Sequence, residues 1–519
     1  MSAAIHWRGV TLAFAVVLLG ITYYPYSKLG SEFMPPLDEG DVLYMPTMFP
    51  GVSITKAKEF LQQSDKILKS FPEVHHVFGK VGRAQTATDA APLSMIETTV
   101  NLKPRAEWPN PDKSTKELVA EFDKAIQFPG VANAWTMPIK TRIDMLSTGI
   151  KTPIGIKVSG PDLNVLQAVS QDIEQAMKTM PETTSAFGDR AVGGYYLDFD
   201  IDREKASRYG LTVGAVQDVI QTAVGGMNIT ETVEGLERYP VNLRYPRALR
   251  QDLETLKRVL ISTPTGNQIP IAMVAELELR RGAPVIKSED ARPNAWIYVD
   301  ISTDDIGGFV LNAKNVLAEQ VTIPPGYTVV WSGQFEYMER AEKRLRIVAP
   351  ATLLIIFLLL YFNFRNINEP IVVMMSIPFA LVGGIWSIYV YGYNISVAVA
   401  VGLIALAGMA AEIGVLVLSF IDVEINKLKA ISSKMLSTDD IKQAVLSATS
   451  KRVRPVAMTA ISTMAGLVPI MLSNGTGSDV THRIAAPMLG GMLTVMILNL
   501  VVLPVIYSLV LEYKESRSV

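Results

Sequence analysis

The chain has 519 residues, 49% of them hydrophobic, and its 48 Lys and Arg residues against 50 Asp and Glu give a net charge of −2. This balance gives no indication of a nucleic-acid-binding surface. The sequence contains no cysteine, which excludes disulfides, thiolate metal sites and a cysteine nucleophile. The apolar residues are concentrated in long segments, so the composition predicts a protein that lies partly in a membrane.

The first apolar run extends from about Val10 to Tyr23 and ends in a cluster of tyrosines. Aromatic residues of this kind are enriched where a helix meets the membrane surface, and no small-residue cleavage site follows. We therefore predict an uncleaved membrane helix within residues 1–28. About 315 residues of mixed polarity follow, to about Arg346, which is enough for more than one globular domain.

Strands and amphipathic helices alternate in this soluble body. The predicted strands are 41–46, 74–81, 96–102, 154–158, 195–201, 238–245, 256–263, 273–279, 295–301 and 328–332. The predicted helices are 53–70, 115–126, 163–180, 213–223 and 309–320. This β-α-β spacing indicates small split α/β sandwiches, and a change of pattern near residue 193 indicates an inserted module.

Five further apolar segments, each long enough to span or nearly span a bilayer, close the chain at 347–364, 371–391, 397–420, 457–472 and 484–511. The loop at 421–456 is basic through Lys427, Lys429, Lys434, Lys442, Lys451, Arg452 and Arg454. Positively charged loops stay on the cytoplasmic side. We therefore predict six transmembrane helices, with both termini in the cytoplasm and the soluble body outside it, which in a bacterium is the periplasm.

Glu412 lies inside the apolar segment 397–420, among the small residues Ala407, Gly408, Ala410, Ala411 and Gly414. A carboxylate at bilayer depth costs about 3 kcal/mol or more, so such residues usually face an ion path or a partner. The small neighbours would let other helices approach closely and bury the carboxylate against protein. Glu412 is therefore a candidate functional residue. The alternative is an acid near a helix end that reaches the membrane surface.

Residues that could form a catalytic centre are scarce. The four histidines are His6, His75, His76 and His482, and the adjacent pair would point to opposite faces of a strand. Neither an HExxH or GxSxG pattern nor a phosphate-binding P-loop pattern is present. The sequence therefore gives little support to an enzyme.

Methionine offers a different chemistry, and the chain contains 22 of them. A thioether is a soft ligand that suits Cu(I) and Ag(I) and binds harder divalent ions poorly. Most methionines fill irregular gaps in protein cores. Met45, Met95 and Met145 lie in three separate segments of the soluble body, and spacing alone does not show whether the fold brings them together.

Six short segments are distinctive: 34–41 (MPPLDEGD), 142–151 (RIDMLSTGIK), 154–160 (IGIKVSG), 233–235 (VEG), 382–384 (VGG) and 483–488 (RIAAPM). Together they closely resemble the heavy-metal efflux branch of the resistance-nodulation-division (RND) transporters, especially the Cus-type copper/silver pumps. The resemblance runs nearly from end to end of this chain. It covers only the second half of that family's chain, which is built from two repeats of six spans.

The resemblance implies a metal site. Met45, Met95 and Met145 would hold Cu(I) or Ag(I) in a periplasmic cleft, with Glu97 and Arg142 beside them. The metal ion would be the substrate, and no permanently bound cofactor is implied.

The resemblance also makes Glu412 the acid of a proton relay, with protons as the coupling ion. Two residues depart from the family pattern. Val456 stands where the Cus-type pump has a lysine that completes the relay. Thr481 stands where the family has a methionine on its membrane-side metal path.

The expected fold is that of an α+β membrane protein with six transmembrane helices, periplasmic ferredoxin-like porter subdomains and an inserted docking subdomain. The first helix is expected at 1–28 and the other five at 344–519, with the cytoplasmic loop at 421–456. One porter subdomain is expected at 29–150, a second at 151–192 with 296–343, and the docking subdomain at 193–295.

The expected function is that of the C-terminal half of a proton-driven pump that exports Cu(I) or Ag(I). The family's first half, further copies in a trimer, a periplasmic adaptor, an outer-membrane channel and membrane lipid are the implied partners; nucleic acid is not one. The alternatives are efflux of another metal ion, a non-transport member of the superfamily, and a nonfunctional fragment.

Overall fold

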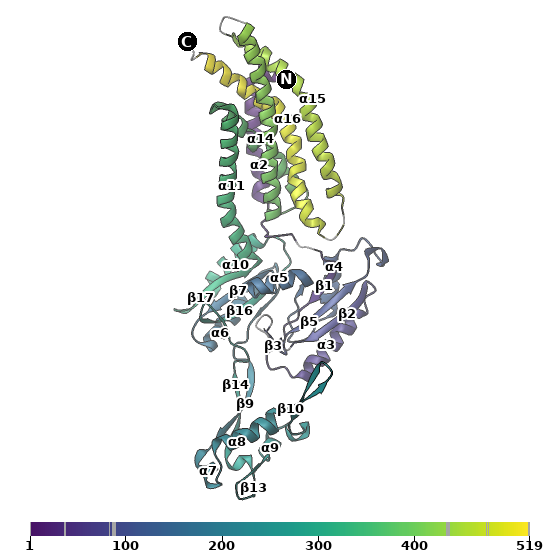
Figure 1. The fold of residues 1–519 in the computed structure, drawn as a ribbon, viewed down its shortest axis with the longest axis vertical. Coiled ribbons are helices and arrows are strands. Elements are labelled where there is room, and N and C mark those ends of the chain that lie inside the picture. The colour runs from purple at the N-terminus through teal and green to yellow at the C-terminus, as the bar shows by residue number, and fades with distance from the viewer. Residues whose placement is uncertain are drawn as a thin grey trace. The chain divides into compact units, whose positions relative to one another are not determined.

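The computed structural model describes residues 2–35, 38–82, 84–85, 90–431, 436–473, 475 and 477–516. Pro36 and Leu37 of the distinctive 34–41 segment, and Lys434 of the basic loop, lie outside the described residues. The chain divides into two compact units (Figure 1). The first unit is Met1–Asp189 with Ser288–Val519, and the second is Arg190–Lys287.

The described part of the first unit contains six segments that are long and apolar enough to cross a membrane. They are α2 (Arg8–Lys28), α11 (Gln334–Phe364), α12 with α13 (Asn368–Met374 and Ser376–Val390), α14 (Val397–Ile431), α15 (Thr438–Met471) and α16 (Ser478–Ser516), preceded by the short α1 (Ser2–His6). Several helices extend beyond the predicted apolar segments. The polar first turns of α11 stay helical because acid–base pairs one turn apart, such as Glu342 with Arg346, support them.

Glycines let α16 pack closely against its neighbours. A Cβ atom on Gly383 of α13 would lie 2.2 Å from the carbonyl oxygen of Gly490 on α16. A Cβ atom on Gly402 of α14 would lie 2.4 Å from the carbonyl oxygen of Ile484. Small residues of this kind let helix backbones touch in a membrane, where packing rather than water exclusion drives association.

The first sheet of the soluble body has the strand order β2-β5-β1-β6 and is antiparallel throughout. Its strands are β1 (Asp41–Tyr44), β2 (Val74–Val81), β5 (Ile96–Leu102) and β6 (Trp135–Thr136), and β3 (Ala84–Gln85) pairs separately with β4 (Ala90–Ala91). Helices α3 (Ile54–Lys69) and α4 (Thr115–Ala125) begin after Ser53 and Ser114, whose hydroxyl oxygens accept backbone N–H bonds. The core between these helices and the sheet includes Tyr44, Phe60 and Phe122.

The second sheet has the order β15-β16-β7-β17, with β8 also paired to β16. Its strands are β7 (Ile154–Ser159), β8 (Thr183–Gly188), β15 (Lys287–Glu289), β16 (Arg292–Ile301) and β17 (Thr328–Gly333). Helices α6 (Leu163–Lys178) and α10 (Ile306–Gln320) begin after Asp162 and Asp305, whose carboxylates accept backbone N–H bonds. Their apolar faces share one core with the strands, including Ile156, Ile173 and Ile297.

Helix α5 (Pro138–Thr148) was not predicted from the sequence. Its first residue is proline, which suits a helix start, but the preceding Met137 offers no side-chain cap, so the usual Ser, Thr, Asp or Asn signal is missing. The helix ends normally at Gly149, which adopts a left-handed conformation with φ of 78°.

The second unit is built on the antiparallel pair β9 (Gly194–Ile201) and β14 (Ala275–Gly282). Its own core includes Leu211, Val216 and Ile271. The smaller elements are α7 (Arg203–Arg208), α8 (Val213–Val219), α9 (Leu253–Leu256), β12 (Leu260–Ser262) and β13 (Gln268–Pro270). The docking subdomain expected at 193–295 overlaps this unit.

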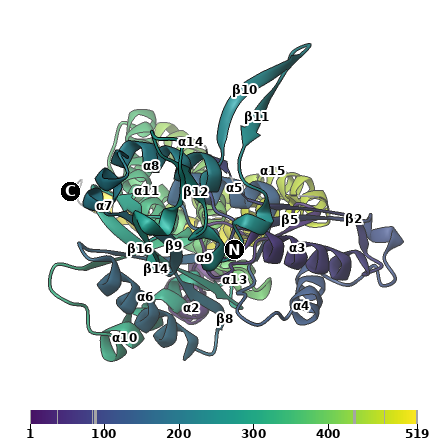
Figure 2. The same cartoon turned by 90° about the horizontal axis from the view of Figure 1, so that it is seen from below.

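A hairpin of β10 (Met227–Glu234) and β11 (Glu237–Leu243) belongs to the second unit, and all its residues are exposed. Figure 2 shows the hairpin projecting from the helices of its unit. The sequence predicted β11 but not β10. The strand predicted at 256–263 is shorter in the structure: the short helix α9, capped by Asp252, takes up Leu256, and β12 begins at Leu260.

Candidate functional site

Met45, Met95 and Glu97 share one face of the first sheet. The pairing of β1 with β5 continues in the same register to Thr47, which lies opposite Met95. This register sets Met45 opposite Glu97. Residues that lie opposite each other, and residues two apart on one strand, project from the same face of a sheet.

Met45 is 0% exposed although it is not part of the core that α3 and α4 form with the sheet. That core uses the alternate residues, among them Tyr44 and Ile96, which project from the opposite face. Met95 is half-buried. The two predicted ligands therefore lie on the face that the sheet's own helices leave uncovered.

Helix α5 brings Met145 to this face. The hydroxyl of Thr141 on α5 lies 2.5 Å from the hydroxyl of Thr136, which pairs with Leu43 and so projects from the same face as Met45. Met145 lies one turn beyond Thr141 and therefore on the same side of the helix. It is half-buried, whereas Arg142 is exposed on another side of α5. The backbone thus gathers the three methionines, with Glu97, around one face.

Glu97 forms an ion pair with Lys80, with 2.8 Å between Oε2 and Nζ, and its side chain is 12% exposed. Its charge is thereby partly neutralised. Among the described residues, no group of three or more His, Asp or Glu side chains is placed to hold a metal ion. The three predicted ligands on this face are neutral thioethers.

Glu412 does not lie where its small neighbours led us to expect. It is exposed on α14, while Ala410, Ala411, Ile413 and Gly414 are buried. Gly414 contributes to close packing, with Val373 3.1 Å from the position of its missing Cβ. The buried stripe of α14 faces the other helices of this chain, and residue 412 projects away from that stripe.

A polar cluster that sequence reasoning missed lies where α12, α14 and α16 meet. The Tyr507 hydroxyl donates a short hydrogen bond to Asp422 and lies 3.5 Å from Glu369. Lys514 lies 3.7 Å from the same Glu369 oxygen. Asp422 and Glu369 each lie two residues outside a predicted apolar segment. An acid within two residues of either end of an apolar run is the signal that could have found them.

A second missed pair joins the segment after α2 to α16. The Nε atom of Arg483 lies 2.7 Å from Oε1 of Glu32, and both side chains are nearly buried. Burial raises the pKa of Glu32, and the charge of Arg483 opposes this shift. The neighbouring Ser31 pairs with Ile395 and donates its N–H to Asp305 at 2.8 Å.

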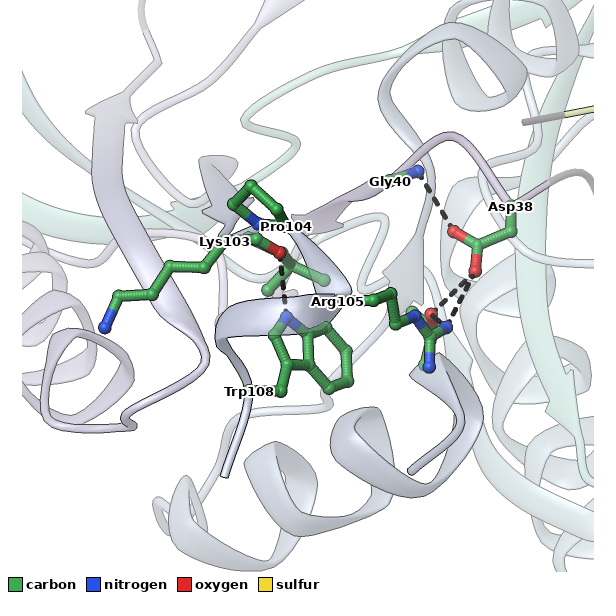
Figure 3. Close-up of a pocket in the computed structure, with 8 residues that line it drawn as sticks. Asp38, Gly40, Lys103, Pro104, Arg105 and Trp108 are labelled. Atoms are coloured by element: carbon green, nitrogen blue, oxygen red, sulfur yellow. Dashed lines mark hydrogen bonds and ion pairs between the residues drawn. The ribbon is translucent and has the colours of Figure 1, made fainter. Parts of the chain in front are cut away.

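Figure 3 shows a pocket of about 350 Å³ elsewhere in the first sheet region, lined by Asp38, Gly40, Leu102, Lys103, Pro104, Arg105, Trp108 and Thr115. The Arg105 guanidinium lies 3.3 Å from Asp38 and 4.5 Å above the Trp108 ring. Asp38 pairs with Arg105, Lys103 adds a second cation, and none of the predicted ligands lines this pocket. Its chemistry is therefore separate from the methionine face.

The two residues that depart from the family pattern have different surroundings. Val456 is buried in the core formed by the membrane helices, and Thr481 is exposed on α16. A valine at the first position cannot carry a proton.

The chain is similar in sequence to metal-resistance proteins. A model of the AcrB/AcrD/AcrF family matches residues 1–511. The cation efflux system proteins SilA of Salmonella typhimurium and CusA of Escherichia coli K12 are 46% and 45% identical to it, over 99% and 97% of this chain and 49% and 48% of their own. The cobalt-zinc-cadmium resistance protein CzcA of Cupriavidus metallidurans is 35% identical over 96% of this chain and 47% of its own. The chain thus spans about half the length of these relatives.

The fold is similar to that of a solved transporter. A crystal structure of a heavy metal efflux pump matches with a TM-score of 0.87 at 28% identity, covering 98% of this chain and 50% of the pump chain. The expectation of a transporter family rather than an enzyme family is confirmed by these relatives. The chain belongs to the AcrB/AcrD/AcrF family of RND efflux transporters.

Proposed function

We propose that this chain is part of an RND heavy-metal efflux pump and that Met45, Met95 and Met145 bind Cu(I) or Ag(I) during export. The observation that carries the proposal is the placement of the methionines. Two share a sheet face by register, and the third lies on the helix that contacts this face. Three thioethers form a site suited to a soft monovalent ion.

Efflux of a harder divalent ion is the alternative that the likeness to CzcA raises. Such ions prefer imidazole and carboxylate ligands. Glu97 is the carboxylate opposite Met45, and it is paired with Lys80. A site with three thioethers and one compensated carboxylate favours the soft ions.

We also propose that Glu412 carries protons through the membrane helices together with a second six-helix half. A carboxylate that projects from an apolar helix is costly in lipid, so a protein partner is the more stable cover. The relatives named above are about twice as long as this chain, which contains six membrane helices among its described residues. Val456, in place of the family's lysine, adds no positive charge to the proton relay. The second half would therefore supply the charged residues that act with Glu412.

The wider assembly is proposed by analogy with the family. It comprises a trimer in the bacterial inner membrane, with both termini in the cytoplasm and the α/β body in the periplasm, an adaptor and an outer-membrane channel. The basic loop after α14 supports this orientation.

Silver binding to the purified full chain tests the metal site. We expect Met45→Ile, Met95→Ile and Met145→Ile each to weaken Ag(I) binding at least tenfold, because isoleucine keeps the apolar bulk but removes a sulfur ligand. Isothermal titration in detergent measures the affinity. Met177→Ile is the matched control, because Met177 is 0% exposed in the core of the second sheet. Unchanged affinity in all three site variants would refute the site.

A further inference from the structure

Helix α5, which carries Met145, is capped by a residue from far along the chain. Glu39 accepts the backbone N–H of Ile139 at 2.7 Å and that of Lys140 at 2.8 Å. These are the second and third residues of the helix, and Pro138 has no N–H to satisfy. One carboxylate therefore satisfies both exposed donors and lies at the positive end of the helix dipole.

The segment that follows α5 is tied to the strand that carries Met45. The Lys151 ammonium donates to the Met45 carbonyl oxygen at 2.9 Å and to the Thr47 hydroxyl at 2.6 Å. Gly149 makes the turn between the helix and this lysine, with its own N–H bound to the Met145 carbonyl oxygen at 2.9 Å. Lys151 therefore links the end of the Met145 helix directly to the backbone of a second predicted ligand.

Between these two ends, α5 has little hydrophobic anchorage. Its buried residues are all polar: Thr141, Asp144 and Thr148. Apart from the half-buried Met145, its large apolar side chains are more than half exposed: Ile139, Ile143 and Leu146. No α5 residue belongs to a hydrophobic core cluster of the described residues. Since most helices are held by an apolar face, the position of α5 depends to an unusual degree on polar contacts at its ends.

We propose that Glu39 and Lys151 are positioning residues for the three-methionine site. They hold α5 at both ends, so that the Met145 thioether lies within reach of a metal ion held by Met45 and Met95. This inference rests on the proposed function. Glu39, from the acidic 38–41 segment, and Lys151, after α5, would thus raise metal affinity without contacting the metal.

The test compares Glu39→Gln and Lys151→Leu with matched controls in the full chain. Glu117→Gln alters a carboxylate that likewise accepts a backbone N–H at a helix start, on α4. Lys103→Leu removes an ammonium that likewise donates to a carbonyl oxygen, at 2.6 Å from that of Pro72. Isothermal titration gives the Ag(I) affinity, and X-ray absorption at the silver edge gives the number of bound sulfurs.

We expect both positioning variants to weaken Ag(I) binding about 10- to 100-fold, as loss of an outer-shell support does elsewhere. The sulfur count should fall from three to two, because Met145 is the ligand that α5 carries. The controls should stay within about twofold and keep three sulfurs. Glu39→Asp, which keeps the charge at a shorter reach, should give an intermediate affinity and serves if Glu39→Gln does not fold.

Two results would overturn the inference in different ways. If Met45→Ile loses Ag(I) binding while Glu39→Gln and Lys151→Leu keep wild-type affinity and three sulfurs, the site stands and the positioning role falls. If Met45→Ile also binds like wild type, the proposed site itself falls and the inference falls with it.

Discussion

At the scale of single residues, Asp300 on β16 is held in an unfavourable environment for a charge. Burial raises the pKa of Asp300 to about 6, and the nearby Asp123 charge acts in the same direction. The backbone N–H of Ile301 and the charge of Lys140 act against this shift. An aspartate in an unfolded chain has a pKa near 3.9. Between these values the folded chain retains a proton that the unfolded chain has released, so stability falls as pH rises.

Asp300→Asn should therefore stabilise the protein at neutral pH, because it removes the buried charge while its amide oxygen can still accept the Ile301 N–H. The gain at pH 7 is at most about 3 kcal/mol, the free-energy equivalent of roughly two pKa units. At pH 4 wild type and variant should unfold alike. Thermal unfolding of the full chain at both pH values measures this. An equal difference at the two pH values would show that charge burial is not the cause.

At the scale of elements, the sequence predicted most strands and helices whose signals are local. Ser53 marks the start of α3, and the alternation of Ile96 to Leu102 marks β5, because the cap and the pleat are encoded within the element itself. Helix α5 was missed because its N-terminal partner, Glu39, is 100 residues from Ile139 in the sequence. Signals of that kind exist only once the chain has folded.

Close packing between membrane helices is another feature that single residues control. Gly383→Ala should lower stability by about 1–3 kcal/mol, because the new Cβ would meet the Gly490 carbonyl oxygen, 2.2 Å from its ideal position. Gly408→Ala is the matched control on α14, since nothing lies within 4 Å of its Cβ position. It should be neutral or stabilising, by up to about 1 kcal/mol from helix propensity. Denaturant unfolding in detergent distinguishes them, and an equal effect of both would contradict the packing argument.

At the scale of the whole molecule, the sequence identified candidate ligands but not their surroundings. Thioether chemistry and family resemblance named Met45, Met95 and Met145, while the register that places two of them on one face is a property of paired strands. The sequence did not show that Glu412 lies on the exposed side of α14 in this chain, because small neighbours show that a helix packs closely but not which side of it does. Which face is buried depends on helices far away in the sequence.

The proposed relay makes a prediction about the assembled pump. With a complementary six-helix half co-expressed, Glu412→Gln should abolish Ag(I)-dependent proton movement in vesicles, because glutamine cannot take up and release a proton. Ag(I) affinity should be unchanged, since Glu412 lies in a membrane helix and the methionines lie in the α/β body. Glu424→Gln, near the end of the same helix and paired with Lys451 at 2.8 Å, is the control. Proton movement that survives Glu412→Gln would refute the relay.

The segment that follows α2 has a mechanical consequence. Ser31 is bonded to Asp305, which caps α10, and its neighbour Glu32 is paired with Arg483 on α16. Leaving one partner of a buried ion pair without the other costs about 3–5 kcal/mol. Where Ser31 and Glu32 join them, α16 and α10 are therefore expected to move together. A displacement of α16 within the membrane would be transmitted through Glu32 and Ser31 to α10, and from α10 to the second sheet on which it packs.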